Sequence, residues 1–213
     1  MSESNRQALV PGTVLHIKKI GEAVINHVEF GEENGHEWVD LGLSVKWATC
    51  NVGAASPGDY GSYFAWGEIS AKENYGRSNY KCGQAKYNRA DGRLFLEMSD
   101  DAARTNWGGG WRMPTKTEFD ELINNCTWTW TTQDGKNGYK VTSKKNGNSI
   151  FLPATGRRYG SSVHSAGADG YYWSSSLRTD SPDFAWYLFF SSSFFSTRND
   201  YRCSGRSVRP VIE

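Results

Sequence analysis

The segment 184–195 near the C-terminus constrains the fold most, because all but two of its side chains are aromatic or serine. In a β-strand, successive side chains point to opposite faces. Trp186, Leu188 and Phe190 would then share one face, and Tyr187 and Phe189 the other. The pattern leaves two interpretations open. Either the strand is buried on both faces, or it packs the first set in the core and exposes the second as a binding surface.

The rest of the chain predicts a mixed α+β domain with short antiparallel strands and long loops. Residues 51–95 are rich in Gly, Asn, Ser and Tyr and show little periodicity, so we expect long loops there. Asp134-Gly135 and Asn146-Gly147 are turn signals, the second being a typical hairpin signal. Strands are expected at 128–132, 149–152, 171–175, 185–190 and 207–212, at weaker signals over 13–17 and 23–28, and around a glycine-containing turn within 38–47.

Two helices are predicted. Thr115 and Glu118 fit a capping box, and an apolar stripe at i, i+3 and i+4 follows, so the helix should end near Asn125. The stripe consists of Phe119, Leu122 and Ile123. A shorter helix is expected over 100–104, with Ser99 as its N-cap.

Composition excludes several classes of protein. With 24 Lys+Arg and 23 Asp+Glu, the formal net charge is +1, which argues against binding of nucleic acid and against a polybasic membrane anchor. The mean hydropathy of −0.64 and the lack of a long apolar run exclude a transmembrane helix. At 14% aromatic residues, the chain is expected to fold rather than to be disordered.

The first 36 residues differ from the rest and are too few for a core of their own. We interpret residues 1–36 as an N-terminal arm that packs on the main domain, joins subunits of a homo-oligomer or attaches to a carrier. Residues 37–213 would form the main domain.

The N-terminus has no apolar stretch behind basic residues, so no secretory signal is predicted. This leaves open cytoplasmic synthesis followed by assembly into a virion, and display on a cell surface if the chain has been shortened.

Six motifs in a fixed order carry a resemblance to a known family. They cover the chain from Trp38 to Val211 and resemble the Fibrobacter succinogenes major paralogous domain, a family common in gut Bacteroidetes and their phages. The resemblance implies a C-type lectin-like fold of the formylglycine-generating-enzyme subtype. The motifs lie at Val39–Gly53, Tyr63–Glu68, Asn106–Thr115, Ile150–Gly156, Tyr172–Ser176 and Gly205–Val211.

Within that fold group, residues 171–204 resemble the variable region of a diversity-generating retroelement variable protein. In such systems adenines are mutated, and Asn codons of the AAC type cannot become codons for Lys, Glu, Gln, Met or Trp. Residues 171–212 contain no Lys, Glu, Gln or Met, although this depletion begins earlier, at about Asn146. The resemblance implies that the varied, ligand-binding positions are Tyr171, Arg178, Asp180, Ser181, Asp183, Phe184, Tyr187, Phe189, Ser191, Phe194, Ser196, Arg198, Asn199, Asp200, Tyr201 and Ser204. The scaffold between them would be Tyr172, Trp173, Ala185, Trp186, Leu188, Phe190, Arg202 and residues 207–211.

The resemblance implies a ligand-binding protein that recognises a protein or glycan on a bacterial surface, displayed on a phage tail or a cell. Because Tyr187 and Phe189 fall in the varied set, it also favours their exposure. An undiversified Bacteroidetes cell-surface or adhesin domain is the alternative. A less favoured alternative is an oxidase-like enzyme that uses Cys203, since the fold subtype includes an oxidase with two cysteines near its C-terminus. In this chain the C-terminal region contains Cys203 but no second cysteine to pair with it.

No cofactor and no metal are expected. The four cysteines form no C-x-x-C pair, so a zinc site is not predicted. Four reduced thiols and a single disulfide, for which Cys50 with Cys126 is a candidate, both remain open. The histidines are scattered, and Asp180–Asp183 fits a turn rather than a calcium-lectin motif. Asn106–Trp111 lacks the Lys-Ser/Thr of a phosphate loop and is interpreted as a bend that buries two tryptophans.

Overall fold

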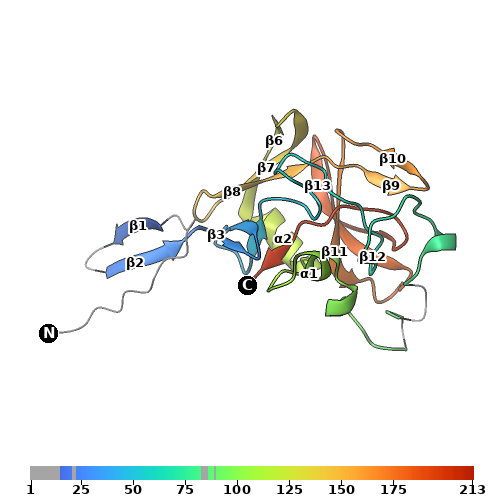
Figure 1. Ribbon diagram of the computed structural model, residues 1–213. Coiled ribbons are helices and arrows are strands. Elements are labelled where there is room, and N and C mark those ends of the chain that lie inside the picture. Colours follow the sequence, from blue (N-terminus) through green and yellow to red (C-terminus); the bar gives the residue numbers. More distant parts are fainter. Residues whose placement is uncertain (1–14, 21–22, 83–85, 89) are drawn as a thin grey trace.

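A computed structural model describes residues 15–20, 23–82, 86–88 and 90–213 of the chain. The fold is mixed α+β and mostly β, with two α-helices and several small antiparallel sheets (Figure 1). None of the helices in this described part is long and apolar enough to cross a membrane.

The elements are β1 (Leu15–Ile20), β2 (Ala23–Val28), β3 (Phe30–Glu33), β4 (His36–Val39), β5 (Lys46–Ala48), the 3-10 turns η1 (Arg77–Asn79) and η2 (Met98–Asp100), α1 (Ala102–Trp107), α2 (Lys116–Asn125), β6 (Cys126–Gln133), β7 (Lys136–Ser143), β8 (Ser149–Pro153), β9 (Arg157–Tyr159), β10 (Ser162–His164), β11 (Gly170–Leu177), β12 (Phe184–Ser191), β13 (Phe194–Tyr201) and β14 (Val211–Ile212).

Both predicted helices are present, and α2 has the predicted capping box and C-terminus. The Thr115 side chain accepts a hydrogen bond from the Glu118 backbone, and the Glu118 side chain accepts one from the Thr115 backbone. The N-cap predicted for α1 is wrong. Asp101 caps that helix, because its carboxylate accepts from the backbone N–H of Arg104, while Ser99 lies in η2.

The strands form a four-stranded sheet ordered β14-β5-β4-β3, two three-stranded sheets, β6-β7-β8 and β11-β12-β13, and the pairs β1-β2 and β9-β10. The Asp134-Gly135 turn joins β6 to β7 as predicted, with positive φ at both residues. The connection from β7 to β8 is longer than a two-residue hairpin and spans residues 144–148. Of the strand expected at 207–212, only β14 forms a strand.

Two hydrophobic cores lie on opposite faces of the β11-β12-β13 sheet. Tyr172, Leu188 and Phe190 point into the first core, together with α2 and the β6-β7-β8 sheet. Tyr171, Trp173 and Tyr187 point into the second core, which also contains α1 and the long loop between β5 and α1. This sheet is therefore covered on both faces over most of its length.

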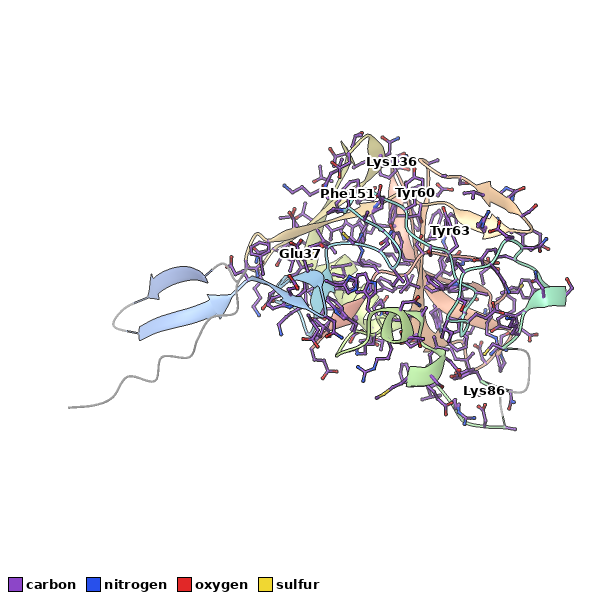
Figure 2. All side chains as sticks on the ribbon, viewed as in Figure 1. Glu37, Tyr60, Tyr63, Lys86, Lys136 and Phe151 are labelled. Atoms are coloured by element: carbon purple, nitrogen blue, oxygen red, sulfur yellow. The ribbon has the colours of Figure 1, made fainter. Side chains whose placement is uncertain are left out.

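The long loop between β5 and α1 is fastened to the rest of the domain at several points, as expected for an ordered loop of this length. Phe64 and Arg206 exchange two backbone hydrogen bonds, and the Trp66 indole donates to the Ser174 carbonyl at 2.8 Å. Near the top of the molecule, the Lys136 ammonium lies 5.1 Å from the ring centre of Tyr60 (Figure 2). The predicted bend also forms, since Trp107 and Trp111 are both buried.

The four cysteines are free thiols, so the candidate disulfide between Cys50 and Cys126 does not form. Cys126 is buried in the first core, whereas Cys50 packs against the second. The two thiols thus belong to different parts of the interior.

The N-terminal region divides at Phe30. The β1-β2 hairpin stands apart from the body of the molecule in Figure 1. In contrast, β3 pairs with β4, and its turn docks on the domain: Asn34 donates to the Trp107 carbonyl at 3.2 Å, and the Trp111 indole donates to the Glu33 carbonyl at 2.8 Å. The packing of the main domain therefore reaches back to Phe30.

Acid should weaken this docking through His36. Its imidazole stacks on Trp107 with ring centres 3.7 Å apart and planes 6° apart. Burial lowers the pKa of His36 from its usual 6.5, and the Glu32 carboxylate only partly opposes this. Because the folded state binds fewer protons at this site than the unfolded state, its contribution to stability is intact above pH 6.5 and declines as the pH falls through that value.

Urea denaturation at about pH 7.5 and about pH 5.5 measures this effect around the histidine pKa. We expect His36→Phe, which keeps an aromatic ring against Trp107, to show a smaller loss of stability on acidification than the unaltered protein. An equal loss in both proteins would contradict the role of His36.

Candidate functional site

The sheet formed by β11, β12 and β13 carries most of the side chains predicted to bind a ligand. Cross-strand pairing places Tyr171 opposite Phe189, Tyr187 opposite Arg198, and Ser191 opposite Phe194. These side chains share one face of the sheet. We call the aromatic and arginine members of this set, with the neighbouring Arg157, the aromatic–arginine cluster; it consists of Arg157, Tyr171, Tyr187, Phe189, Phe194 and Arg198.

The expected exposure of this face is only partly correct. Tyr187 is 6% exposed and Tyr171 is 8% exposed, because the second core covers this part of the sheet. Phe189 is half-buried and packs against the margin of that core. Phe194 is 46% exposed and Arg198 is exposed, and both lie on the outer strand β13. The strand is thus buried on both faces in its middle and open at one end. On its other face, Leu188 and Phe190 are buried as expected.

Trp186 was also expected in the core. It is only half-buried and lies beneath the Lys116 ammonium, 4.9 Å from its ring centre.

The rings and guanidinium groups of the cluster form a continuous row. Tyr171 stacks on Tyr187 at 5.9 Å between ring centres and meets Phe189 edge-on at 5.2 Å. The Arg198 guanidinium carbon lies 4.2 Å from the Phe189 ring centre and 5.1 Å from that of Phe194. Arg157 lies 5.5 Å from the ring centre of Tyr171. Planar guanidinium groups are stabilised on aromatic faces in this way while their N–H edges stay free to donate.

A buried arginine supports the cluster from below. Arg206 is fully buried, with its guanidinium carbon 3.4 Å from the Tyr187 ring centre and 4.4 Å from that of Trp173. Its Nη2 donates to Asp200 Oδ2 at 2.5 Å, and the same oxygen lies 3.5 Å from Arg157 Nη1. One carboxylate therefore serves two cations. Burial also raises the pKa of Tyr171 above its ordinary value.

A second group of predicted positions lies at the far end of the same sheet, where β12 begins and β13 ends. Phe184 stacks on Tyr201 with ring centres 4.4 Å apart, and Arg77 lies 4.1 Å from the Tyr201 ring centre. Arg178 forms a bidentate ion pair with Asp180 and donates to Asn199 at 2.7 Å. We call this group the Phe184–Tyr201 corner. Side-chain alternation along β12 places Phe184 on the face opposite Tyr187, so the structure does not unite all predicted positions in one patch.

The remaining predicted positions are mostly at the surface. Asp183 is exposed, and Ser181, Ser191 and Ser196 are half-buried. Ser204 is buried at 5% exposure, because its backbone carbonyl lies beside the Trp173 indole in the second core. Ser204 therefore does not lie on a face open to a ligand.

Three arginines near these groups were not predicted as site residues: Arg77, Arg157 and Arg206. The sequence offered a signal for two of them, because they lie at the ends of motifs singled out in the sequence analysis. Arg157 directly follows the motif Ile150–Gly156, and Arg206 is the second residue of the motif Gly205–Val211. Arg77 lies in the loop of low periodicity, where no local pattern indicates its contact with Tyr201.

Other chemically active groups have structural explanations. A pocket of about 590 Å³ lined by Met98, Trp111 and Met113 includes Asp101, but that carboxylate accepts from the backbone of Arg104 and Met113. Burial raises the pKa of the Cys203 thiol, which disfavours the thiolate. Within the described residues there is no group of three or more His, Cys, Asp or Glu side chains that could hold a metal ion.

Residues 123–211 match a family model described as a domain of unknown function (DUF8237). The matched stretch includes strands β6 to β13, and so the whole of the aromatic–arginine cluster and most of the Phe184–Tyr201 corner. No curated protein and no solved structure matches the chain.

Proposed function

We propose that this chain is a non-enzymatic ligand-binding protein with a C-type lectin-like fold, and that it is a diversity-generating retroelement variable protein of a gut bacterium or phage. Its receptor-recognition surface would be the open part of the aromatic–arginine cluster together with the Phe184–Tyr201 corner. The ligand would be a protein or glycan on a bacterial surface.

One observation carries this proposal: aromatic and arginine side chains emerge from a sheet that is packed on both faces elsewhere. Such a sheet holds its exposed side chains on a fixed backbone, so that little ordering free energy is lost on binding. Tyr, Trp and Arg are the residues that dominate binding energy in protein interfaces. Phe194, Arg198 and Tyr201 are exposed and pack against neighbouring rings or cations. Exchange of these side chains would change specificity without disturbing either core.

Two further features support a binding role over an oxidase-like enzyme. A cysteine nucleophile works as a thiolate, in an environment that lowers its pKa. Cys203 is buried with a raised pKa, and its side chain points away from solvent. Each of the other three cysteines also lies outside β11, β12 and β13.

Deep sequencing of the coding segment for residues 171–204 across the source population tests the proposal. We expect replacements to concentrate at exposed positions of the predicted set, such as Phe194, Arg198 and Tyr201. Trp173, Leu188 and Phe190 should remain unchanged, because both cores depend on them. A uniform segment would favour the undiversified cell-surface domain, and replacements spread equally over the three scaffold positions would contradict both interpretations.

A further inference from the structure

The aromatic–arginine cluster and the buried Arg206 beneath it carry more positive charge than the neighbouring carboxylates balance. Arg157 and Arg198 of the cluster and Arg206 contribute three cations. Asp200 is shared between Arg157 and Arg206, and Asp169, which accepts from the Tyr171 hydroxyl at 3.3 Å, is the second carboxylate beside the cluster. In a protein whose formal net charge is only +1, this local excess is a property of the face rather than of the whole molecule.

Arg198 is the cation with the greatest capacity to bind an anion. It is exposed, and within the described part of the chain no acidic side chain lies within ion-pair distance of it. Its contacts with Phe189 and Phe194 hold the guanidinium plane in place. A guanidinium fixed in this way presents a fork of N–H donors that matches the two oxygens of a carboxylate.

Arg157 repeats this arrangement on the adjacent ring. It stands over Tyr171, and its side chain is 42% exposed. Among the described residues, its one ion pair is with Asp200 Oδ2, at 3.5 Å, which is longer than the 2.5 Å contact of that oxygen with Arg206. Tyr171 and Phe189 are cross-strand partners with ring centres 5.2 Å apart. Two guanidinium groups therefore stand over two neighbouring rings, each with donors available at the surface.

We infer that the ligand of this face is a protein surface that bears carboxylates, with Arg198 and Arg157 as the residues that determine this specificity. This inference rests on the proposed function and adds the chemical class of the ligand. Aromatic rings beside arginines at an open sheet end are typical of the central residues of protein–protein interfaces. An acidic glycan shares the carboxylate, and so the test includes one.

Binding of the full chain to immobilised poly-L-glutamate, to its neutral hydroxyethyl-glutamine derivative and to polygalacturonate tests this inference. We expect binding to poly-L-glutamate in preference to the other two polymers. Arg198→Gln should weaken it about tenfold, which is about 1.4 kcal/mol, since the variant loses a charge-assisted hydrogen bond to a carboxylate. Arg157→Gln should weaken it in the same direction. Lys140→Gln is the matched control, because it removes one cation from an exposed position on β7 and should change binding by less than about twofold.

Several results would overturn the inference: no binding to poly-L-glutamate, equal binding to the neutral polymer, or equal weakening by Arg198→Gln and Lys140→Gln. Arg198-dependent binding that favours polygalacturonate would overturn it in favour of a glycan ligand. Because population sequencing judges the proposed function without any ligand, a failure here is distinguishable from a failure of that proposal.

Discussion

Replacing Arg209 with methionine should lower the free energy of unfolding by about 3–5 kcal/mol, among the largest effects expected for a single substitution in this protein. Arg209 is fully buried, and it uses all three guanidinium nitrogens. Its Nε donates to the Asn51 side chain at 2.8 Å, and its Nη1 donates to the carbonyls of Ala48 and Thr49 at 3.0 and 2.7 Å. Its Nη2 donates to the Phe151 carbonyl at 3.0 Å.

The effect follows from what remains after the substitution. Methionine fills a similar volume, so the loss comes from hydrogen bonds rather than from a cavity. Three backbone carbonyl oxygens and one amide oxygen would lose this donor, all of them buried except the half-buried Thr49 carbonyl, and a buried acceptor without a partner costs about 1–3 kcal/mol. Because these acceptors belong to β5, the following loop and β8, the substitution also removes hydrogen bonds that join these three segments.

Urea denaturation of Arg209→Met beside Arg93→Met measures this difference. Arg93 pairs with Asp91 and Glu97 at the surface, where ion pairs contribute at most about 1 kcal/mol. We expect the Arg209 variant to be destabilised several times more than the Arg93 variant. Similar losses in the two variants would show that the buried hydrogen bonds add little to stability.

Local sequence patterns correctly predicted helix α2 and the turn between β6 and β7. The capping box and the apolar stripe lie within α2, and the Asp134-Gly135 turn requires only that both residues adopt positive φ. For such features the relevant interactions lie within a few residues of one another. The N-cap of α1 was missed because Ser99 and Asp101 are both favourable capping residues, and the choice depends on which one the chain places before the first helical turn.

The candidate site depends on contacts that are distant in sequence, and these were predicted less well. Strand β13 was not expected, since it contains Asn and Asp, which are poor strand formers; its pairing with β12 overrides that preference. Alternation along β12 indicated which side chains share a face but not what covers each face. The covering of Tyr187 comes from Arg206 and from a loop more than a hundred residues earlier, which includes Phe64. No local pattern encodes that contact.

Tyr187 is therefore the position at which burial and the proposed diversification make opposite demands. It belongs to the predicted varied set, yet it is buried against Tyr171, Trp173 and the guanidinium of Arg206. Two of the three Arg206 nitrogens, Nε and Nη1, have no hydrogen-bond partner among the described residues, so the face of the Tyr187 ring is a principal stabilising contact of this buried cation. Phe194 belongs to the same predicted set but is exposed.

Tyr187→Ser should consequently reduce the free energy of unfolding by about 3–5 kcal/mol, as for removal of other buried aromatic rings, whereas Phe194→Ser should change it by less than about 1 kcal/mol. The serine variant at position 187 leaves a cavity and an arginine that has lost its aromatic neighbour, and the variant at position 194 leaves neither. Denaturation of the two variants under the same conditions measures both values. If Tyr187→Ser were as mild as Phe194→Ser, position 187 would be free to vary and the second core would tolerate loss of the ring. If the difference is as large as expected, only side chains that still cover Arg206 can occupy position 187. Stability would then limit sequence variation at position 187, whereas only the ligand would limit it at position 194.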